Sequence, residues 1–131
     1  MKKVRDVMFK GVVTVHLDAS VKEIAKVLIE NDISGVVAVD STGETWGVVT
    51  DMDLIKCYAE EKIDLVAEDI MSSQVLAVEP EMSLKDAAAF MHSHQIHRTF
   101  VMSARSTYVT KNIPIGVISA TDVIREMLGR F

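Results

Sequence analysis

The sequence predicts an α+β fold built from two copies of one β-α-β-β-α unit. The first observation is a string that occurs at residues 47–53 and again at 116–122: glycine, two β-branched apolar residues, a hydroxyl residue and, three positions later, an aspartate. The second is that the chain matches itself at an offset of 63 residues, where Asp-Val-Met at 6–8 falls on Asp-Ile-Met at 69–71. A six-residue insertion in the second copy then raises the offset to 69. We therefore expect two repeats, residues 1–63 and 64–131, that form one compact body.

Length and composition set outer limits on the class of protein. The chain has 131 residues, of which 49% are hydrophobic and 25% charged, and this is ordinary for a globular domain with a real core. Its net charge of −5 disfavours bulk attraction to nucleic acid or to an anionic membrane. Cys57 is the only cysteine, which excludes an internal disulfide and a cysteine-based zinc cluster. No apolar run approaches the ~20 residues that a membrane span needs, and no apolar signal segment follows the basic N-terminus, so we expect a cytoplasmic protein.

Each repeat should open with a short strand and a helix. After an apolar turn, strands are expected at residues 12–15 and 75–78. A serine N-cap with an acidic residue three positions later then starts a helix at Ser20 and again at Ser83. Apolar residues follow at positions i, i+3, i+4 and i+7 in both copies, which predicts one buried face for each helix.

A hairpin and a second helix complete each repeat. In the first repeat the turn at residues 40–44 separates two strands, 36–39 and 45–50. In the second repeat the strands are expected at 99–102 and 113–119, with the polar residues 103–112 as a long loop between them. The closing helices are expected at residues 52–62 and 121–129.

The repeated string places two polar side chains on the first turn of each closing helix. These are Thr50 with Asp53 and Ser119 with Asp122. Because the first backbone N–H groups of a helix have no partner within it, a polar ligand can be held there. A carboxylate also accepts two hydrogen bonds, which suits the two hydroxyls of a ribose. The alternative is that each side chain only caps its own helix.

These residues make the chain resemble a tandem pair of cystathionine-β-synthase (CBS) domains, often called a Bateman module. The resemblance covers essentially the whole chain, and Ile96-His97-Arg98 ahead of a central strand is a further hallmark. It implies two sheets packed face to face with approximate twofold symmetry, and two clefts between the repeats that can each hold an adenosine-containing ligand. Val37 and Phe100 stand where the family usually has proline, and Phe100 is expected to reshape one cleft.

The resemblance also assigns roles to individual residues. Asp53 and Asp122 are implied as the ribose ligands, and the hydroxyls of Thr50 and Ser119 as donors to ribose or phosphate oxygens. One cleft is implied to combine Thr50 and Asp53 with His97, Arg98 and Thr121, and the other to combine Ser119 and Asp122 with Ser34 and Gly35. Arg98 is a planar donor for phosphate oxygens, so we expect the Asp53 cleft to bind a nucleotide phosphate more tightly. The adenine slot is implied to be lined by Val13, Thr14, Leu76 and Ala77, of which the apolar three could equally be plain core residues.

The expected function is a non-catalytic regulatory module that senses AMP, ADP or ATP and needs no cofactor. We expect a homodimer that passes the ligand state to a separate enzyme or transporter. Three other readings stay open: a ligand-free interaction scaffold, nucleic-acid binding, and binding of S-adenosylmethionine, although Arg98 is unfavourable beside a sulfonium cation. No nucleophile–base pair indicates an enzyme, and no basic stripe indicates nucleic-acid binding. His92 and His94 point about 200° apart on a helix, so no metal site is expected.

Overall fold

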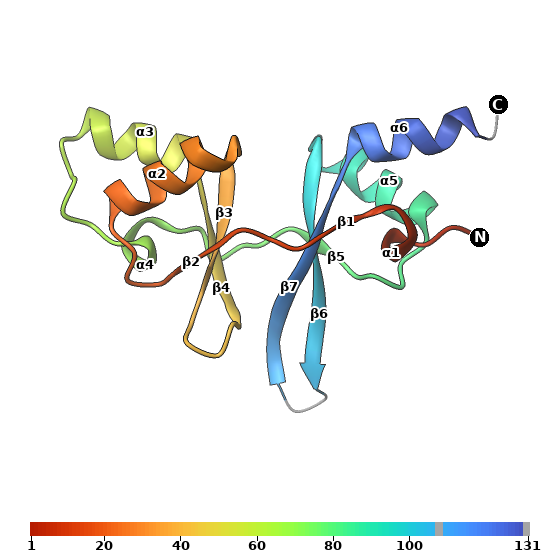
Figure 1. Ribbon diagram of the computed structural model, residues 1–131, viewed down its shortest axis with the longest axis horizontal. Coiled ribbons are helices and arrows are strands. Elements are labelled where there is room, and N and C mark those ends of the chain that lie inside the picture. The colour runs from red at the N-terminus through yellow and green to blue at the C-terminus, as the bar shows by residue number, and fades with distance from the viewer. Residues whose placement is uncertain (107–108, 130–131) are drawn as a thin grey trace. The chain divides into compact units, whose positions relative to one another are not determined.

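The computed structural model describes residues 1–106 and 109–129, and its elements form two compact α+β units (Figure 1). We call residues 13–75 the central unit, and residues 1–12 together with 76–131 the terminal unit. In each unit the helices cover one face of the sheet (Figure 1). The α+β class predicted from the sequence is confirmed. No helix in the described ranges is long and apolar enough to cross a membrane.

The central unit has a three-stranded sheet in the order β2-β3-β4. Its first two strands run parallel, and the second and third form the predicted hairpin. Ile24 and Leu28 of α2 are buried against this sheet, as the apolar periodicity predicts. The elements are β2 (Thr14–His16), α2 (Val21–Asn31), β3 (Gly35–Val39), β4 (Thr45–Thr50), α3 (Asp51–Ala59) and α4 (Ala67–Ile70).

The terminal unit repeats this arrangement and adds a strand, in the order β1-β7-β6-β5. The added strand β1 is antiparallel to β7, with Phe9 opposite Val117. Leu84 and Ala87 of α5 are buried against the sheet. The elements are α1 (Val4–Val7), β1 (Phe9–Lys10), β5 (Ala77–Val78), α5 (Leu84–Ser93), β6 (Arg98–Ser106), β7 (Val109–Ser119) and α6 (Ala120–Leu128).

The predicted N-caps start both α2 and α5. Ser20 Oγ accepts a hydrogen bond of 3.1 Å from Glu23 N, and Ser83 Oγ accepts one of 3.1 Å from Asp86 N. Each bond satisfies a backbone donor that has no partner inside its helix. The duplicated caps therefore fix the same helix start in both repeats.

The compact units do not follow the boundary between the sequence repeats. The first dozen residues of each repeat, which we call its leading arm, pack in the unit formed by the rest of the other repeat. In the first arm Val4 N donates to Met82 O at 2.9 Å, and in the second arm Ala67 N donates to Ala19 O at 2.9 Å. Val4 and Ala67 are both fully buried. Each unit therefore takes part of its core from the arm of the other repeat.

Two salt bridges connect the first arm to the rest of the terminal unit at its surface. Lys3 Nζ and Arg5 Nη1 each lie 2.7 Å from a carboxylate oxygen of Glu81, in the turn before α5. The hydrogen bond from Lys3, helped by the charge of Arg5, holds the pKa of Glu81 below its ordinary value. Because all three side chains are exposed, their contribution to stability is small beside that of the buried Val4.

The glycine of the repeated string is required by the leading arms. Strand β4 bonds the second arm through Val48 N to Ser72 O at 3.0 Å and through Ser72 N to Val48 O at 2.9 Å. A Cβ atom on Gly47 would lie 2.6 Å from Ser72 O, and a Cβ atom on Gly116 would lie 2.6 Å from Phe9 O of the first arm. No side chain fits at either position unless the arm moves.

The predicted loop at residues 103–112 is wrong. Strands β6 and β7 continue through this segment, with Ser103 opposite Ile113, Ala104 opposite Asn112 and Ser106 opposite Val109. Its polar composition favours a loop, but a polar segment that contains β-branched residues can extend a ladder that neighbouring residues have already started. Thr107 and Tyr108 lie outside the described residues.

The turn between β3 and β4 is organised by Asp40. Its Oδ1 accepts hydrogen bonds from Thr42 Oγ1 at 2.6 Å and from the backbone N of Thr42 at 2.9 Å and Glu44 at 3.1 Å, while Oδ2 accepts one from Trp46 Nε1 at 2.9 Å. The side-chain hydrogen bonds from Thr42 and Trp46 hold the pKa of Asp40 well below its usual range. The ionised carboxylate is therefore the form that stabilises the turn.

We expect Asp40→Asn to lower the melting temperature at neutral pH and to change the emission of Trp46, the only tryptophan. Since the folded-state pKa is depressed, the stabilisation is present above the unfolded-state pKa of about 3.9 and is lost as pH falls toward the folded-state value. The gap between wild type and variant should accordingly close as the pH falls below about 4. Asp64→Asn, at an exposed aspartate of the same unit, is the control. A gap that stays constant from neutral pH to below pH 4 would contradict this role for Asp40.

Candidate functional site: two polar sheet edges

Three segments of the central unit meet at one edge of its sheet. Strand β2 starts at Thr14 and runs parallel to β3, which starts at Gly35, and Gly35 lies opposite Thr50 at the end of β4. Ser34 O accepts a hydrogen bond of 2.8 Å from Asp51 N, which ties the start of β3 to the first turn of α3. The predicted residues of this unit are therefore neighbours. We call Val13, Thr14, Ser34, Thr50 and Asp53 the central edge.

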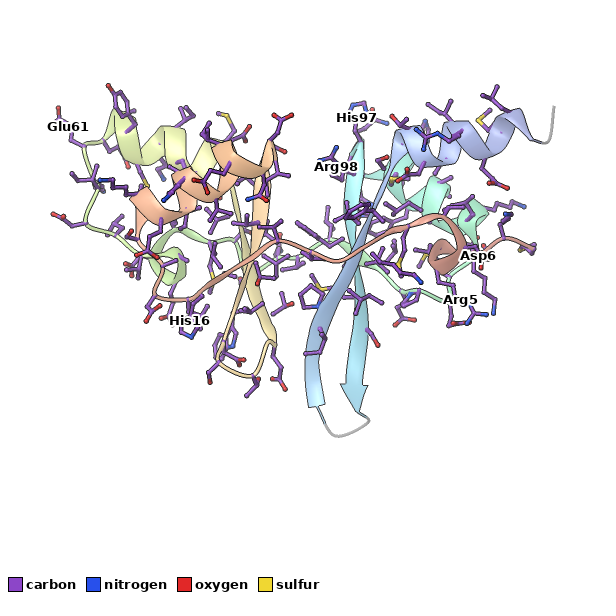
Figure 2. All side chains as sticks on the ribbon, in the orientation of Figure 1. Arg5, Asp6, His16, Glu61, His97 and Arg98 are labelled. Atoms are coloured by element: carbon purple, nitrogen blue, oxygen red, sulfur yellow. The ribbon has the colours of Figure 1, made fainter. Side chains whose placement is uncertain are left out.

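The terminal unit builds the equivalent edge from its own strands. Strand β5 starts at Ala77, and Arg98 at the start of β6 lies opposite Ser119 at the end of β7. His97 O accepts a hydrogen bond of 2.8 Å from Ala120 N. Figure 2 shows His97 and Arg98 at the tip of β6 beside the first turn of α6. We call Leu76, Ala77, His97, Arg98, Ser119, Thr121 and Asp122 the terminal edge.

Both aspartates of the repeated string cap their helices. Asp53 Oδ2 accepts hydrogen bonds from Thr50 N at 2.8 Å and from Thr50 Oγ1 at 3.2 Å. Asp122 Oδ2 accepts one from Ser119 N at 2.9 Å, and Ser119 Oγ accepts one from Asp122 N at 3.2 Å. The reciprocal bonds of Ser119 and Asp122 form a capping box, and Asp53 caps α3 by accepting both bonds from Thr50, so the structural role that the sequence left as an alternative is real.

Capping uses only one oxygen of each carboxylate. Asp53 is partly buried, and its Oδ1 accepts no hydrogen bond from any described residue. Asp122 Oδ1 has one long contact, of 3.5 Å, to Arg125 Nη1. Since a carboxylate oxygen carries two lone pairs, each edge offers a rigidly held acceptor to a ligand.

The two edges differ in charge. Arg98 and His97 are exposed at the terminal edge, and within the described ranges Arg98 forms no ion pair. In the central unit the matching positions hold Ser34 and Gly35, and the exposed Asp51 follows Thr50. The terminal edge therefore presents a free guanidinium, and the central edge presents only carboxylates and hydroxyls.

Two of the expected adenine-lining residues are not core residues. Val13 is 36% exposed and Leu76 is 43% exposed, and neither belongs to either buried cluster. Reading them as plain core residues is therefore wrong. Val37 and Phe100 are the two residues that stand where the resembled family usually has proline. Val37 is fully buried, and Phe100 is partly buried opposite Ala77 and Val117. The effect of Phe100 on a ligand stays a prediction.

Asp53 and Arg98 belong to different units. The expectation that they serve the same ligand concerns the association of those units, and it stays a prediction. What the structure brings together is Arg98 with Ser119, and Gly35 with Thr50.

A polar hollow in the central unit was not predicted. It has a volume of about 230 Å³ and lies between α3 and the second arm. Lys56 is the one feature that could have indicated it, because it follows Asp53 by three residues on the same helical face. The buried thiol of Cys57 lines the hollow as well. The lining residues are Asp53, Lys56, Cys57, Glu60, Lys62, Leu65, Asp69 and Ile70.

His94, the C-cap residue of α5, has a local role. His94 Nδ1 lies 2.9 Å from Phe90 O, and its ring packs on that of Phe90 with centroids 4.4 Å apart. Within residues 1–106 and 109–129, no three His, Cys, Asp or Glu side chains come together as a metal site would need.

The chain resembles parts of longer curated proteins and one protein of similar length. It is 31% identical over 127 residues to homoserine O-acetyltransferase of Methanohalophilus mahii, and 27% identical over 127 residues to L-aspartate semialdehyde sulfurtransferase of Methanocaldococcus jannaschii. These matches cover 97% of this chain but only 24% and 23% of the relatives. It is also 27% identical over 125 residues to the CBS domain-containing protein YhcV of Bacillus subtilis, with 94% of this chain and 84% of YhcV covered.

Solved structures share the fold over the full length. The CBS domain pair of protein MJ0100, in complex with 5′-methylthioadenosine and S-adenosyl-L-methionine, has a TM-score of 0.79 and 25% identity, with 100% of this chain and 99% of that chain covered. CBSX2 in complex with AMP has a TM-score of 0.80 and 24% identity, with 98% of both chains covered. The CBS domain family model matches residues 4–60 and again residues 66–129. Each matched copy contains an aspartate that caps a helix at a sheet edge. Because the family model matches the chain twice, the chain belongs to the CBS domain family.

Proposed function

We propose that this chain is a non-catalytic regulatory module that binds an adenosine-containing ligand and passes the ligand state to a partner protein. The observation that carries the proposal is the pair of helix-capping aspartates, Asp53 and Asp122. Each is held at a sheet edge with one carboxylate oxygen left to accept hydrogen bonds. Ribose hydroxyls are the donors that such an acceptor suits. The complex of the MJ0100 domain pair with two adenosine derivatives supports this ligand class.

An adenine nucleotide (AMP, ADP or ATP) fits the terminal edge best. Arg98 is exposed, and no ion pair with another described residue occupies its guanidinium, so it can meet phosphate oxygens with two parallel hydrogen bonds. The first turn of α6 adds backbone N–H groups beside it. We therefore place the phosphate contact at Arg98, with His97 and Thr121 as further polar neighbours.

S-adenosylmethionine is the second candidate ligand, and the central edge favours it. This edge has no counterpart of Arg98, and Asp53 together with the neighbouring Asp51 would attract a sulfonium. The MJ0100 domain pair, which is 25% identical to the present chain, is in complex with this compound. One chain could hold both classes of ligand because its two edges differ in charge.

A thermal-shift and calorimetry panel tests the proposal. We expect AMP, ADP, ATP, 5′-methylthioadenosine or S-adenosylmethionine to raise the melting temperature by about 5–10 °C at a hundred times its dissociation constant, equivalent to ~2.7 kcal/mol. Asp53→Asn and Asp122→Asn keep a capping side chain but remove the charged acceptor, and each should weaken binding at least ~10-fold.

Asp69→Asn is the matched control for these variants. Asp69 Oδ2 accepts a hydrogen bond of 3.0 Å from Val66 N, so it caps α4 in the same way, and it belongs to neither edge although it lines the polar hollow together with Asp53. If no compound in the panel raises the melting temperature, the proposal fails and a ligand-free scaffold becomes the better account. If Asp69→Asn weakens binding as much as the edge variants do, the loss reflects charge or stability, not a contact with ribose.

A double-mutant cycle tests whether Arg98 and Asp53 serve one ligand. We expect Arg98→Ala to weaken binding of AMP but not of adenosine, since only AMP carries a phosphate. If the two residues bind the same molecule, the effects of Arg98→Ala and Asp53→Asn should not add. Additive effects, together with coupling between Arg98 and Asp122, would show that Arg98 serves the terminal edge alone.

The partners also belong to the proposal. We propose that the module forms a homodimer and that its ligand changes the surface it offers to a separate enzyme or transporter. For the longer relatives, named for acetyltransferase and sulfurtransferase activities, the match covers about a quarter of the length. A regulatory role beside such an activity is consistent with that proportion.

A further inference from the structure

Charged residues line the polar hollow that lies between α3 and the second arm. Four of the lining residues share one face of α3, because they follow the i, i+3, i+4, i+7 spacing of a helix: Asp53, Lys56, Cys57 and Glu60. Of these four only Cys57 is buried. Leu54 already packs α3 against the core of the unit, so the packing of the helix does not require charges on the neighbouring face.

Charges at the corresponding positions of the terminal unit are paired within the chain. Arg125 Nη1 lies 3.5 Å from Asp122 Oδ1, and Lys2 Nζ of the first arm lies 3.6 Å from Glu126 Oε1. The second pair joins the arm to the helix. The central unit cannot form it, because a leucine and a cysteine stand in place of Lys2 and Glu126. The counterparts of Arg125, Asp122, Lys2 and Glu126 are Lys56, Asp53, Leu65 and Cys57.

Two charges at the hollow have no ionic partner among the described residues. Lys56 forms no ion pair with another described residue. The Oδ2 atom of Asp69 accepts a hydrogen bond of 3.0 Å from Val66 N, whereas its Oδ1 atom accepts none from a described residue. Lys62 and Glu60 form only an exposed ion pair of 3.8 Å. A ligand can therefore pair with Lys56 and Asp69 without breaking an ion pair inside the chain.

The mixture of signs selects the class of ligand. Three carboxylates and two ammonium groups line the hollow. A phosphate or another pure anion would face the carboxylates, and a polyamine would face the lysines. Among the residues that the structure describes, no three His, Cys, Asp or Glu side chains come together to hold a metal ion. A small molecule with one charge of each sign matches both sets of side chains.

The size and the apolar part of the hollow narrow the class further. Its volume is about 230 Å³, and since a water molecule takes about 30 Å³ in the liquid, the hollow has room for roughly eight non-hydrogen atoms. Leu65, Ile70 and the buried thiol of Cys57 supply an apolar surface beside the charges. A ligand that fits carries an ammonium, a carboxylate and a short apolar group.

We propose that the hollow binds a free α-amino acid with a short apolar side chain, of the size of valine or leucine. The carboxylate of the amino acid pairs with Lys56 and its ammonium with Asp69, while its side chain lies against Leu65 and Ile70. Only Asp53 belongs both to the hollow and to the central edge, so the hollow is a second ligand site beside the proposed adenosine sites. A module with both kinds of site responds to an amino acid as well as to an adenosine-containing ligand.

Calorimetric titration of the whole chain with L-valine and L-leucine tests the ligand class. We expect at least one of them to bind with a dissociation constant of about 1 mM or lower. Isoamylamine and 4-methylpentanoate keep the side chain of leucine but each lacks one of its two charges, so each should bind at least ~10-fold more weakly than L-leucine. The proposal is overturned if neither amino acid gives a binding heat or a rise in melting temperature at about 10 mM. It is also overturned if either analogue binds as tightly as L-leucine.

Substitutions test the location. Lys56→Met and Asp69→Asn should each weaken binding of the amino acid at least ~10-fold, because each removes one charged partner. Lys22→Met is the control for the first, since Lys22 is an exposed lysine of α2 in the same unit. Asp6→Asn is the control for the second, because Asp6 Oδ2 accepts a hydrogen bond of 2.9 Å from Lys3 N and so caps α1 as Asp69 caps α4. Equal losses from the hollow variants and their controls, or no loss from the hollow variants, overturn the proposal.

Titration of the same proteins with the adenosine compounds separates this inference from the proposed function. Lys56→Met and Asp69→Asn should leave the affinity for those compounds unchanged, because neither residue belongs to a sheet edge. If L-leucine binds and no adenosine compound does, the proposed function fails and the amino-acid site stands. If an adenosine compound binds and neither amino acid does, the amino-acid site alone is overturned.

Discussion

Gly47→Ala should destabilise the protein by about 3 kcal/mol and lower its melting temperature by about 10 °C. The added Cβ atom would lie 2.6 Å from Ser72 O and 2.7 Å from Met71 Sδ. The flexible side chain of Met71 can move, but the Ser72 carbonyl cannot yield cheaply, because Ser72 is bonded in both directions to Val48 of β4. Gly116→Ala should have a similar effect on the terminal unit, where the atom 2.6 Å away is Phe9 O. Urea denaturation followed by circular dichroism measures both losses.

Gly35→Ala is the matched control for this prediction. It is the same substitution on the neighbouring strand, and its Cβ atom would meet nothing closer than 3.5 Å, which is ordinary contact. Its stability should stay within about 0.5 kcal/mol of wild type. If Gly47→Ala and Gly35→Ala were equally stable, the arm would not be held against β4 as the structure shows.

Val4→Asp should cost about 4 kcal/mol or more, the largest single effect that we expect. Val4 is fully buried, and it lies in the core of the terminal unit with Val78, Val101 and Ile118. An unpaired carboxylate at that position must either lose its hydration or open the core.

Hydrogen exchange measures where the damage from Val4→Asp occurs. Amides of α5 and β6 in the terminal unit should exchange faster, because the first arm belongs to that unit although it opens the other repeat. Phe9→Asp is the control on the same arm, since Phe9 is exposed, and it should change stability by less than about 0.5 kcal/mol. Equal losses from both variants would contradict the burial of the first arm.

Local signals in the sequence determined most of the secondary structure and the family. The serine caps at Ser20 and Ser83 fix two helix starts, and the strand at 45–50 has its predicted bounds. The repeated string places Asp53 and Asp122 on first helical turns in both copies. These features depend on residues a few positions apart, so a single sequence is enough to predict them.

The components of each edge were predictable for a related reason. The string contributes the hydroxyl and the aspartate, and the repeat alignment identifies Ser34 and Gly35 with His97 and Arg98. The sequence could not show that these segments lie side by side within a unit. That follows from the pairing of Gly35 with Thr50 and of Arg98 with Ser119, which joins residues far apart in the chain.

Only the tertiary structure decided where the leading arms belong. Helices α1 and α4 have four residues each and β1 has two, which is too short for a periodic pattern or for independent stability. Their conformations are stabilised by contacts with the other repeat, such as Val4 with Met82 and Ala67 with Ala19. The leading arms also explain the glycine of the repeated string. The sequence shows only that this glycine is repeated, whereas the close approach of each arm to Gly47 or Gly116 makes it necessary. By itself, therefore, the sequence determined the elements and the polar residues they present, whereas long-range packing decided which repeat completes which core.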